Sequence, residues 1–156
     1  MKTRDLQQLW WDWLGTSERL LRSLYEQTAA LTLRDVARVE RIQPELDQML
    51  AKLRELDAQA VTLAHKLAGE LETEPNLRSL ASVLEKAEAQ ALVGLGNRVT
   101  VAARNVQDVL KKNRTLIENE MNYINGSLTL VAKAAVQAQG PFNTSKPDSI
   151  LVDQAA

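Results

Sequence analysis

The fold is decided by residues 99–135, which read VTVAARNVQDVLKKNRTLIENEMNYINGSLTLVAKAA. Apolar side chains recur in this stretch at steps of three and four residues, the period at which side chains share one face of an α-helix. The exception is Asn113, an amide set into the apolar face. The face is formed by Val99, Ala103, Val106, Leu110, Asn113, Ile117, Met121, Ile124, Leu128, Val131 and Ala135. The stretch predicts the longest amphipathic surface of the chain.

Earlier parts of the sequence repeat this helical period. We expect a first helix over about residues 4–30, with a face made of Leu6, Trp10, Trp13, Ser17, Leu20, Leu24 and Leu31. We expect a second helix with a face made of Val36, Val39, Ile42, Leu46, Leu50, Leu53, Leu56, Ala60, Leu63, Leu67 and Leu71. A third stripe begins with Leu77, Leu80, Leu84, Ala87 and Ala91. The chain therefore consists of long amphipathic helices.

Four sequence features predict where these helices start and stop. Thr32, with Asp35 three positions later, is expected to cap the second helix. Pro44 removes one backbone donor, so we expect a kink near Glu40 or a break there. Pro75 is expected at the first position of the next helix. The segment 94–97, GLGN, is a predicted interruption or hinge of the last stripe.

Composition supports one all-α domain. The chain has 156 residues, of which 45% are hydrophobic and only 4% aromatic, and good helix formers dominate. Long antiparallel helices joined by short turns bury each other's stripes. We therefore predict an elongated antiparallel bundle of three to four long helices, coiled-coil-like, over residues 1–138. Residues 139–156 are rich in Gly, Pro, Asn and Ser, and a flexible C-terminal tail is expected there.

Charge and residue usage exclude several function classes. Nineteen basic against twenty acidic residues give a net charge of −1 with mixed signs, which disfavours nucleic acid as a partner. With no cysteine and only His65 as histidine, we expect no metal, no cofactor and no catalytic residue. The chain lacks an apolar run of about 20 residues, so no stable membrane insertion is expected. Its first residues form no apolar signal segment, which predicts a cytoplasmic protein.

Two features have both a structural and a functional interpretation. Trp10, Trp11 and Trp13 gather within one helical turn, and they either cap one end of a bundle or expose an aromatic anchor for a partner. Asn113 either fixes the register of a buried interface, as a buried Asn does in coiled coils, or lines a face left open for a partner. The spacing of the apolar residues is the same in both cases, so it does not decide between the two interpretations.

The sequence of the last predicted helix resembles that of a known family. The run KKNRTLIE at residues 111–118, continuing through Met121, Tyr123, Ile124 and Leu128, resembles the signature region of FlgN-like flagellar export chaperones. In that family an Asn and a Leu-Leu or Leu-Ile pair precede a final amphipathic helix and a short tail. The length of the chain, the order of its helices and the break at residues 75–77 are compatible with the family.

The resemblance implies a cytoplasmic chaperone of the flagellar type III export system. Its clients would be hook-associated proteins of the hook-filament junction, whose helical C-terminal segments it would bind to prevent premature assembly. The loaded chaperone would then dock at the export gate or the export ATPase complex. Carried over by position, the client-binding residues are Asn113, Leu116, Ile117, Glu120, Met121, Tyr123, Ile124 and Leu128.

The chain departs from the family pattern in its tail. Family members often carry a Tyr-containing, Gly-ended motif after the last helix that is linked to docking at the export gate. Here the corresponding stretch, residues 139–143, reads QGPFN, so Phe142 is the candidate docking aromatic. The alternative hypothesis for the whole chain is a structural coiled-coil protein that uses the same apolar stripes for homo-oligomerisation.

Overall fold

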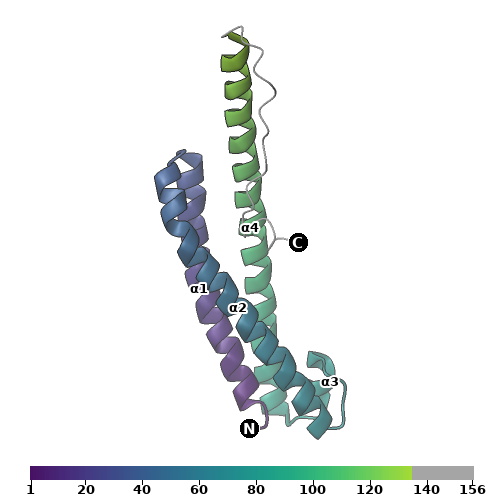
Figure 1. The fold of residues 1–156 in the computed structure, drawn as a ribbon. Coiled ribbons are helices and arrows are strands. Elements are labelled where there is room, and N and C mark those ends of the chain that lie inside the picture. The colour runs from purple at the N-terminus through teal and green to yellow at the C-terminus, as the bar shows by residue number, and fades with distance from the viewer. Residues whose placement is uncertain (135–156) are drawn as a thin grey trace.

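The computed structural model describes residues 1–134, with side chains described as far as Asn122 and at Asn125. These residues form helices α1 (Arg4–Thr32), α2 (Val36–Glu70), α3 (Leu77–Ser82) and α4 (Lys86–Ala134). Residues 1–134 contain no strand, and the long helices lie along one another in an elongated bundle (Figure 1). The predicted all-α helical bundle is confirmed. Helix α2 runs antiparallel to α1, whereas α4 runs parallel to α1, since Thr3 meets Glu88 at one end and Thr28 meets Asn113 toward the other. The predicted tail, residues 139–156, lies outside the described residues.

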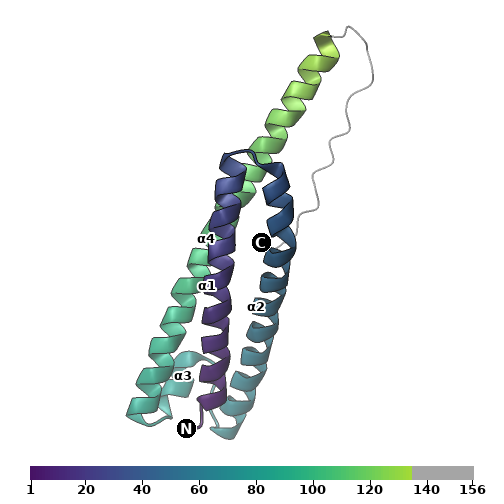
Figure 2. The ribbon, with the colours of Figure 1, turned by 90° about the vertical axis from the view of Figure 1, so that its left-hand side faces the viewer.

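Helix α1 is the centre of the bundle. It packs along its length against both α2 and α4, whereas α2 and α4 have few direct contacts with each other. Figure 2 shows α1 between the other two long helices, with the short α3 at the end of the bundle that holds the N-terminus. The stability of the bundle therefore depends mainly on the two apolar sides of α1.

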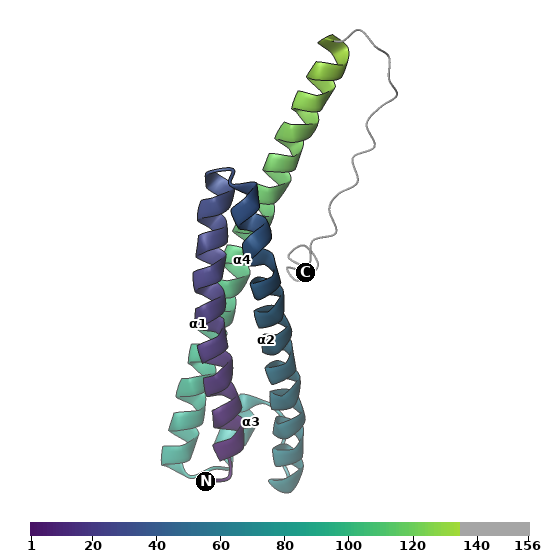
Figure 3. The same ribbon diagram turned by 60° about the vertical axis from the view of Figure 1, so that its left-hand side comes forward.

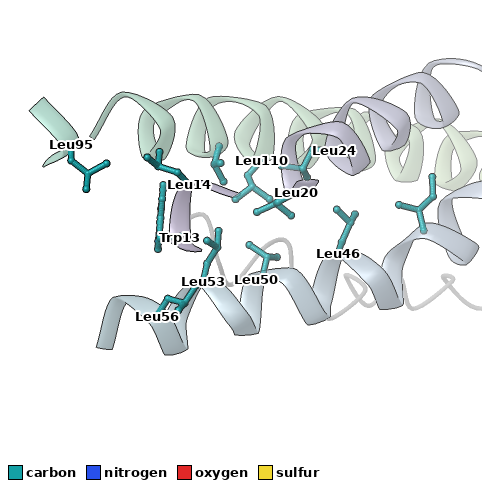
Figure 4. Close-up of a cluster of buried hydrophobic side chains, with 12 residues drawn as sticks. Trp13, Leu14, Leu20, Leu24, Leu46, Leu50, Leu53, Leu56, Leu95 and Leu110 are labelled. Carbon is teal, nitrogen blue, oxygen red and sulfur yellow. The ribbon is translucent and has the colours of Figure 1, made fainter. Parts of the chain in front are cut away.

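The core consists of two clusters of buried apolar side chains. The first draws on α1, α2 and α4, whose side chains point toward one another in Figure 4. Its buried members are Trp13, Leu14, Leu20, Leu24, Ile42, Leu46, Leu50, Leu53, Leu56, Leu95, Val106 and Leu110. The second, at the end with α3, contains Leu6, Ala60, Leu67, Ala68, Leu80 and Leu92. Most of these positions belong to the predicted stripes, so period and burial agree.

The prediction that Thr32 caps α2 is wrong. Thr32 is the last residue of α1, and Asp35 is the N-cap of α2, where its side chain accepts a hydrogen bond of 3.1 Å from the Arg38 amide. Arg34 between them adopts a left-handed conformation with φ 55°. The Asp35 amide then donates to the Ala30 carbonyl at 2.9 Å, which closes the end of α1. Residues 33–35 therefore connect α1 and α2.

Helix α2 runs unbroken from Val36 to Glu70, so of the two predictions at Pro44 the break is wrong, while the kink near Glu40 stays a prediction. Pro44 is exposed, while Ile42 and Leu46 on either side of it are buried in the first core cluster. The ring therefore lies on the solvent side, where water satisfies the carbonyl that loses its donor. Packing of the apolar face against α1 offsets the missing hydrogen bond.

The break in the second half of the chain lies earlier than predicted. Helix α3 begins at Leu77, with Asn76 as its N-cap, and ends at Ser82, so Pro75 lies before the helix and not at its first position as predicted. Helix α4 then continues through residues 94–97 without interruption. A Cβ added to Gly96 would lie 2.7 Å from Cδ2 of Leu77, so this glycine permits close packing of α3 on α4. The glycines that suggested a hinge are part of a straight helix.

Gly94→Ala should therefore stabilise the protein. A Cβ at Gly94 meets no atom within 4 Å, so the substitution removes the backbone freedom of glycine without a clash and should raise the free energy of unfolding by about 1 kcal/mol. Gly96→Ala is the matched variant, and its gain should be smaller because Leu77 must move. Urea denaturation of both variants measures the difference. An equal loss in both would show that the segment works as a hinge.

The N-terminus is fixed by a buried contact with α4. The backbone amide and the hydroxyl of Thr3 both donate to Oε1 of Glu88, each at 2.7 Å. The hydroxyl and then the amide of Thr3 stabilise the carboxylate, and together they outweigh desolvation and lower the pKa of Glu88. This contact ties the start of α1 to the first turn of α4.

Glu88→Gln should cost about 1 kcal/mol of stability at neutral pH, because the charged acceptor of two hydrogen bonds is lost. A lowered pKa in the folded state means that this stabilisation is complete above the ordinary Glu value of 4.5 and disappears as the pH falls through the folded value. The difference between wild type and variant in urea denaturation should therefore shrink below pH 4.5. Glu85→Gln, at an exposed carboxyl just before α4, is the control and should change stability by less than about 0.5 kcal/mol. A pH-independent difference would argue against the contact.

Candidate functional site

The last part of α4 extends beyond the rest of the bundle. Helix α4 passes the turn between α1 and α2 at Glu120. The carboxylate of Glu120 lies 3.2 Å from Nε of Arg34 in that turn. Helix α4 continues for 14 residues beyond Glu120, to Ala134, which is about 21 Å at 1.5 Å per residue. In Figure 3 no other described helix lies beside this extension. An amphipathic stretch of α4 therefore has no neighbouring helix within the described chain.

Asn113 lies where α4 still packs on α1, and it is fully buried. Its amide nitrogen donates to the Leu24 carbonyl and to Oε1 of Gln27, both at 2.9 Å, and its oxygen accepts from the Thr28 hydroxyl. Both ends of this amide are used within the chain. The geometry agrees with the interpretation that Asn113 fixes the register of α4 against α1.

The hydrogen bonds of Asn113 continue into α2. Nε2 of Gln27 donates to Oε1 of Gln43 at 3.2 Å, and Nε2 of Gln43 donates to Oδ1 of Asp47 at 2.8 Å. We call Asn113, Gln27, Thr28, Gln43 and Asp47 the polar layer. Among the described residues every buried side-chain nitrogen and oxygen has a hydrogen-bond partner. The polar layer therefore links the three long helices at low cost in desolvation.

Of the seven predicted client-binding residues other than Asn113, four have described side chains, and all four are half-buried. Ile117 packs against the edge of the first core cluster, and Glu120 forms the ion pair with Arg34. Met121 lies one turn after Ile117 on the same face of α4, and Leu116 lies next to Ile117 in the chain. The structure thus brings these four residues together at the open end of the bundle.

The remaining predicted site residues cannot be placed as side chains. The backbone of Tyr123, Ile124 and Leu128 belongs to the extension of α4, but their side chains lie outside the described ones. Phe142 lies outside the described residues altogether. Their roles stay predictions.

Three residues at this end of the bundle were missed from the sequence. Gln27 and Thr28 form hydrogen bonds with Asn113, and Arg34 forms an ion pair with Glu120. In each pair the two residues are 85 or more positions apart in the sequence. Helical periodicity relates residues only within one helix, so it cannot pair positions on α1 and α4. The signal available in the sequence was a polar residue within the apolar stretch of each helix, at a similar distance from the end of the bundle.

The tryptophans near the N-terminus do not all follow one of the two interpretations, a buried end of the bundle or an exposed anchor. Trp13 is buried in the first core cluster. Trp11 is 47% exposed, and the guanidinium carbon of Arg98 lies 4.7 Å from its ring centroid. A shallow groove between α1 and α4 lies nearby, lined by residues that include Leu21, Arg98 and Val101. One tryptophan therefore serves the core and another lies at the surface.

The described residues offer little for catalysis or metal binding. No group of three His, Cys, Asp or Glu side chains within residues 1–134 could hold a metal ion, and His65 is exposed on α2. None of the described helices is long and apolar enough to cross a membrane. The extension of α4 is amphipathic in sequence, which is typical of a helix that packs against another helix.

Comparison with known families agrees with this geometry. Residues 1–140 match the family model described as FlgN protein, which covers every described helix and the extension of α4. The comparison with curated proteins gave no match, and neither did the comparison with solved structures. Since the match spans nearly the whole chain, the protein belongs to the FlgN family of flagellar export chaperones.

Proposed function

We propose that the late part of α4 binds the helical C-terminal segment of hook-associated proteins and prevents their premature assembly. The binding surface would consist of Leu116, Ile117, Met121 and the extension of α4 that contains Tyr123, Ile124 and Leu128. An amphipathic client helix laid along this apolar face would shield its own apolar side from self-association. The chaperone would act in the cytoplasm, without catalysis.

One observation carries this proposal. Helix α4 extends about 21 Å beyond the turn between α1 and α2, and its apolar period continues through the extension. An apolar face without a helix packed against it is costly in water, which favours a partner. The assignment to a family of flagellar chaperones supports a flagellar protein as that partner.

Asn113 would take part indirectly. Its amide is used by α1, so it would position α4 and not contact the client. Glu120 would act in the same way through Arg34, because their ion pair holds α4 at the turn. These two residues would set the direction in which the extension leaves the bundle.

Delivery to the export gate or the export ATPase complex is the second part of the proposal. Phe142 would provide the aromatic contact in place of the family's tail tyrosine. Phe142→Ala would then leave client binding unchanged and reduce binding to the export-gate component in a pull-down.

The test of client binding uses Met121→Asp. Fluorescence anisotropy of a labelled peptide that ends at the C-terminus of a hook-associated protein should give a Kd at least about tenfold weaker than wild type, because a charge is placed in the apolar contact. Far-UV circular dichroism should stay unchanged, since Met121 is only half-buried.

Asn122→Asp is the matched control, because Asn122 is exposed and points about 100° away from Met121 around the helix. It adds the same charge and should bind the peptide normally. Equal weakening by both variants would contradict the proposed face. A stable homo-oligomer of the wild type that ignores the peptide would favour the structural coiled-coil alternative.

A further inference from the structure

Helices α1 and α4 leave an open groove between them. It is lined by Leu14, Ser17, Glu18, Leu21, Asn97, Arg98, Val101, Ala102 and Asn105. Val101 in this groove is 56% exposed, and Tyr25, one turn of α1 beyond Leu21, is 58% exposed. The exposed ring of Trp11 adjoins the groove through Arg98, whose guanidinium lies over it. An apolar groove with exposed aromatic side chains beside it is typical of a surface that binds a partner.

The wall of the groove on α1 has a helical period of its own. Its residues follow one another at steps of three and four positions: Trp11, Leu14, Glu18, Leu21 and Tyr25. They extend over 14 residues, which is about 21 Å of helix. Leu14 is buried in the first core cluster and Leu21 is half-buried, so the floor of the groove is the edge of the core. The groove therefore has the length that suits another helix laid along α1 and α4.

Two charged side chains line the groove, one on each wall. Glu18 belongs to α1 and Arg98 to α4, and neither forms an ion pair with another described residue. The guanidinium carbon of Arg98 lies 4.7 Å from the centroid of the Trp11 ring. Complementary charges fix the direction and register of a bound partner. A helix that matches this groove therefore carries a basic side chain on the flank toward α1 and an acidic side chain on the flank toward α4.

The groove lies in line with the proposed client surface. Asn105 is at one end of the wall on α4, and Leu116 of the client surface lies 11 residues further along this helix. Eleven residues are close to three full turns, so the two residues share a face of α4, about 17 Å apart along its axis. A partner that covers Leu116 and a partner in the groove therefore lie on the same side of α4.

We propose that the groove between α1 and α4 binds a second helical stretch of the client, upstream of the C-terminal segment that binds the late part of α4. The identity of this partner rests on the proposed function. Trp11, Tyr25 and Val101 supply the apolar contacts, and Glu18 and Arg98 set the direction of the client helix. Two contacts with one client raise the overall affinity, because the second forms at a high local concentration once the first is made.

The groove is tested with the full chain and a full-length hook-associated protein in isothermal titration calorimetry. Val101→Asp should weaken the Kd at least about tenfold, because a charge is placed in the apolar contact. Val61→Asp is the matched control, since Val61 is 52% exposed on α2, and it should leave the Kd unchanged. Far-UV circular dichroism of both variants should equal that of the wild type. Equal effects of the two variants, or no effect of Val101→Asp, would overturn the proposal.

The charges of the groove have a separate test. Glu18→Gln should weaken the Kd about two- to fivefold at low salt, and the difference should shrink as salt is added, because the contact with a basic side chain is screened. Glu45→Gln, at an exposed carboxyl on α2, is the control and should bind normally. A Glu18→Gln variant that binds like wild type at low salt would overturn the assigned direction of the client helix.

Cross-linking identifies the occupant directly. The chain has no cysteine, so Val101→Cys introduces a single thiol for a benzophenone label. Illumination should join it to a stretch of the hook-associated protein upstream of the C-terminal segment, and the same label on Val61→Cys should give no such product. Cross-links to a second copy of the chaperone would overturn the proposal, because the groove would then join two chains. Absence of any cross-link to the client would overturn it as well.

Failure of the groove and failure of the proposed function give different results. If Met121→Asp weakens binding of the hook-associated protein and Val101→Asp does not, the groove is not a client site and the proposed function is retained. If the wild type does not bind the hook-associated protein at all, the proposed function is wrong, and so is this assignment of the groove.

Discussion

Asn113→Asp is expected to lower the free energy of unfolding by about 3–5 kcal/mol at pH 7. The change keeps the shape of the side chain but replaces the amide nitrogen by an oxygen. That oxygen would face the Leu24 carbonyl and Oε1 of Gln27, which both accept hydrogen bonds from Asn113 in the wild type. A buried carboxylate would then have two acceptors opposite it and no cation. Urea denaturation followed by far-UV circular dichroism measures the loss.

The loss should depend on pH in a defined direction. Burial without a donor disfavours the charged form, so the pKa of the introduced carboxyl should rise above its unfolded value of about 3.9. The penalty is then largest above the raised folded pKa and shrinks as the pH falls toward the unfolded value. Stability relative to wild type should therefore start to recover once the pH falls below the raised folded pKa, and the recovery should be complete by about pH 3.9.

Asn119→Asp provides the control, because Asn119 is exposed on the same helix. It should change the free energy of unfolding by less than about 0.5 kcal/mol at any pH. Equal effects of Asn113→Asp and Asn119→Asp would mean that α4 does not pack on α1 in solution at this level. The polar layer would then not exist as described.

Leu20→Ala should cost about 2–5 kcal/mol. Leu20 is fully buried on α1, the helix that packs against both α2 and α4. Removing its branched end leaves a cavity in the first core cluster, and two interfaces lose contacts at once. Thermal and urea unfolding should both show the loss, with the helical signal of the folded state retained.

Leu33→Ala is the matched control for the core. The chemical change is the same, but Leu33 is 71% exposed beside the turn that follows α1. Its stability should change by less than about 0.5 kcal/mol. A comparable loss in both variants would contradict the exposed position of Leu33 outside the folding core.

Much of the fold follows from the sequence alone. Stripes at helical spacing identified the long helices, and residues such as Leu46, Leu50 and Leu53 were predicted on the face that proves buried. These predictions succeed because an amphipathic helix must place its apolar side away from water wherever it packs. The low aromatic content and the short breaks between stripes were enough to indicate an all-α bundle. They did not show that α4 packs parallel to α1.

The ends of the helices needed the tertiary structure. Thr32 and Asp35 are both good caps, and only the left-handed conformation of Arg34 decides that Asp35 begins α2. Residues 94–97 suggested a break, but Leu77 packs against Gly96 and the helix continues. The competing choices differ by about 1 kcal/mol locally, and tertiary packing outweighs such a difference.

The candidate site, too, was predicted in part from the sequence and in part needed the tertiary structure. The sequence determined that the last helix carries an unusually long apolar face with Asn113 set into it, and it suggested the family. Only the tertiary structure decided that Asn113 is sealed against α1, that Glu120 meets Arg34, and that α4 extends beyond both. Periodicity tells which residues share a face of one helix. Whether that face meets a neighbour or water depends on the lengths and positions of the other helices, which no local pattern encodes.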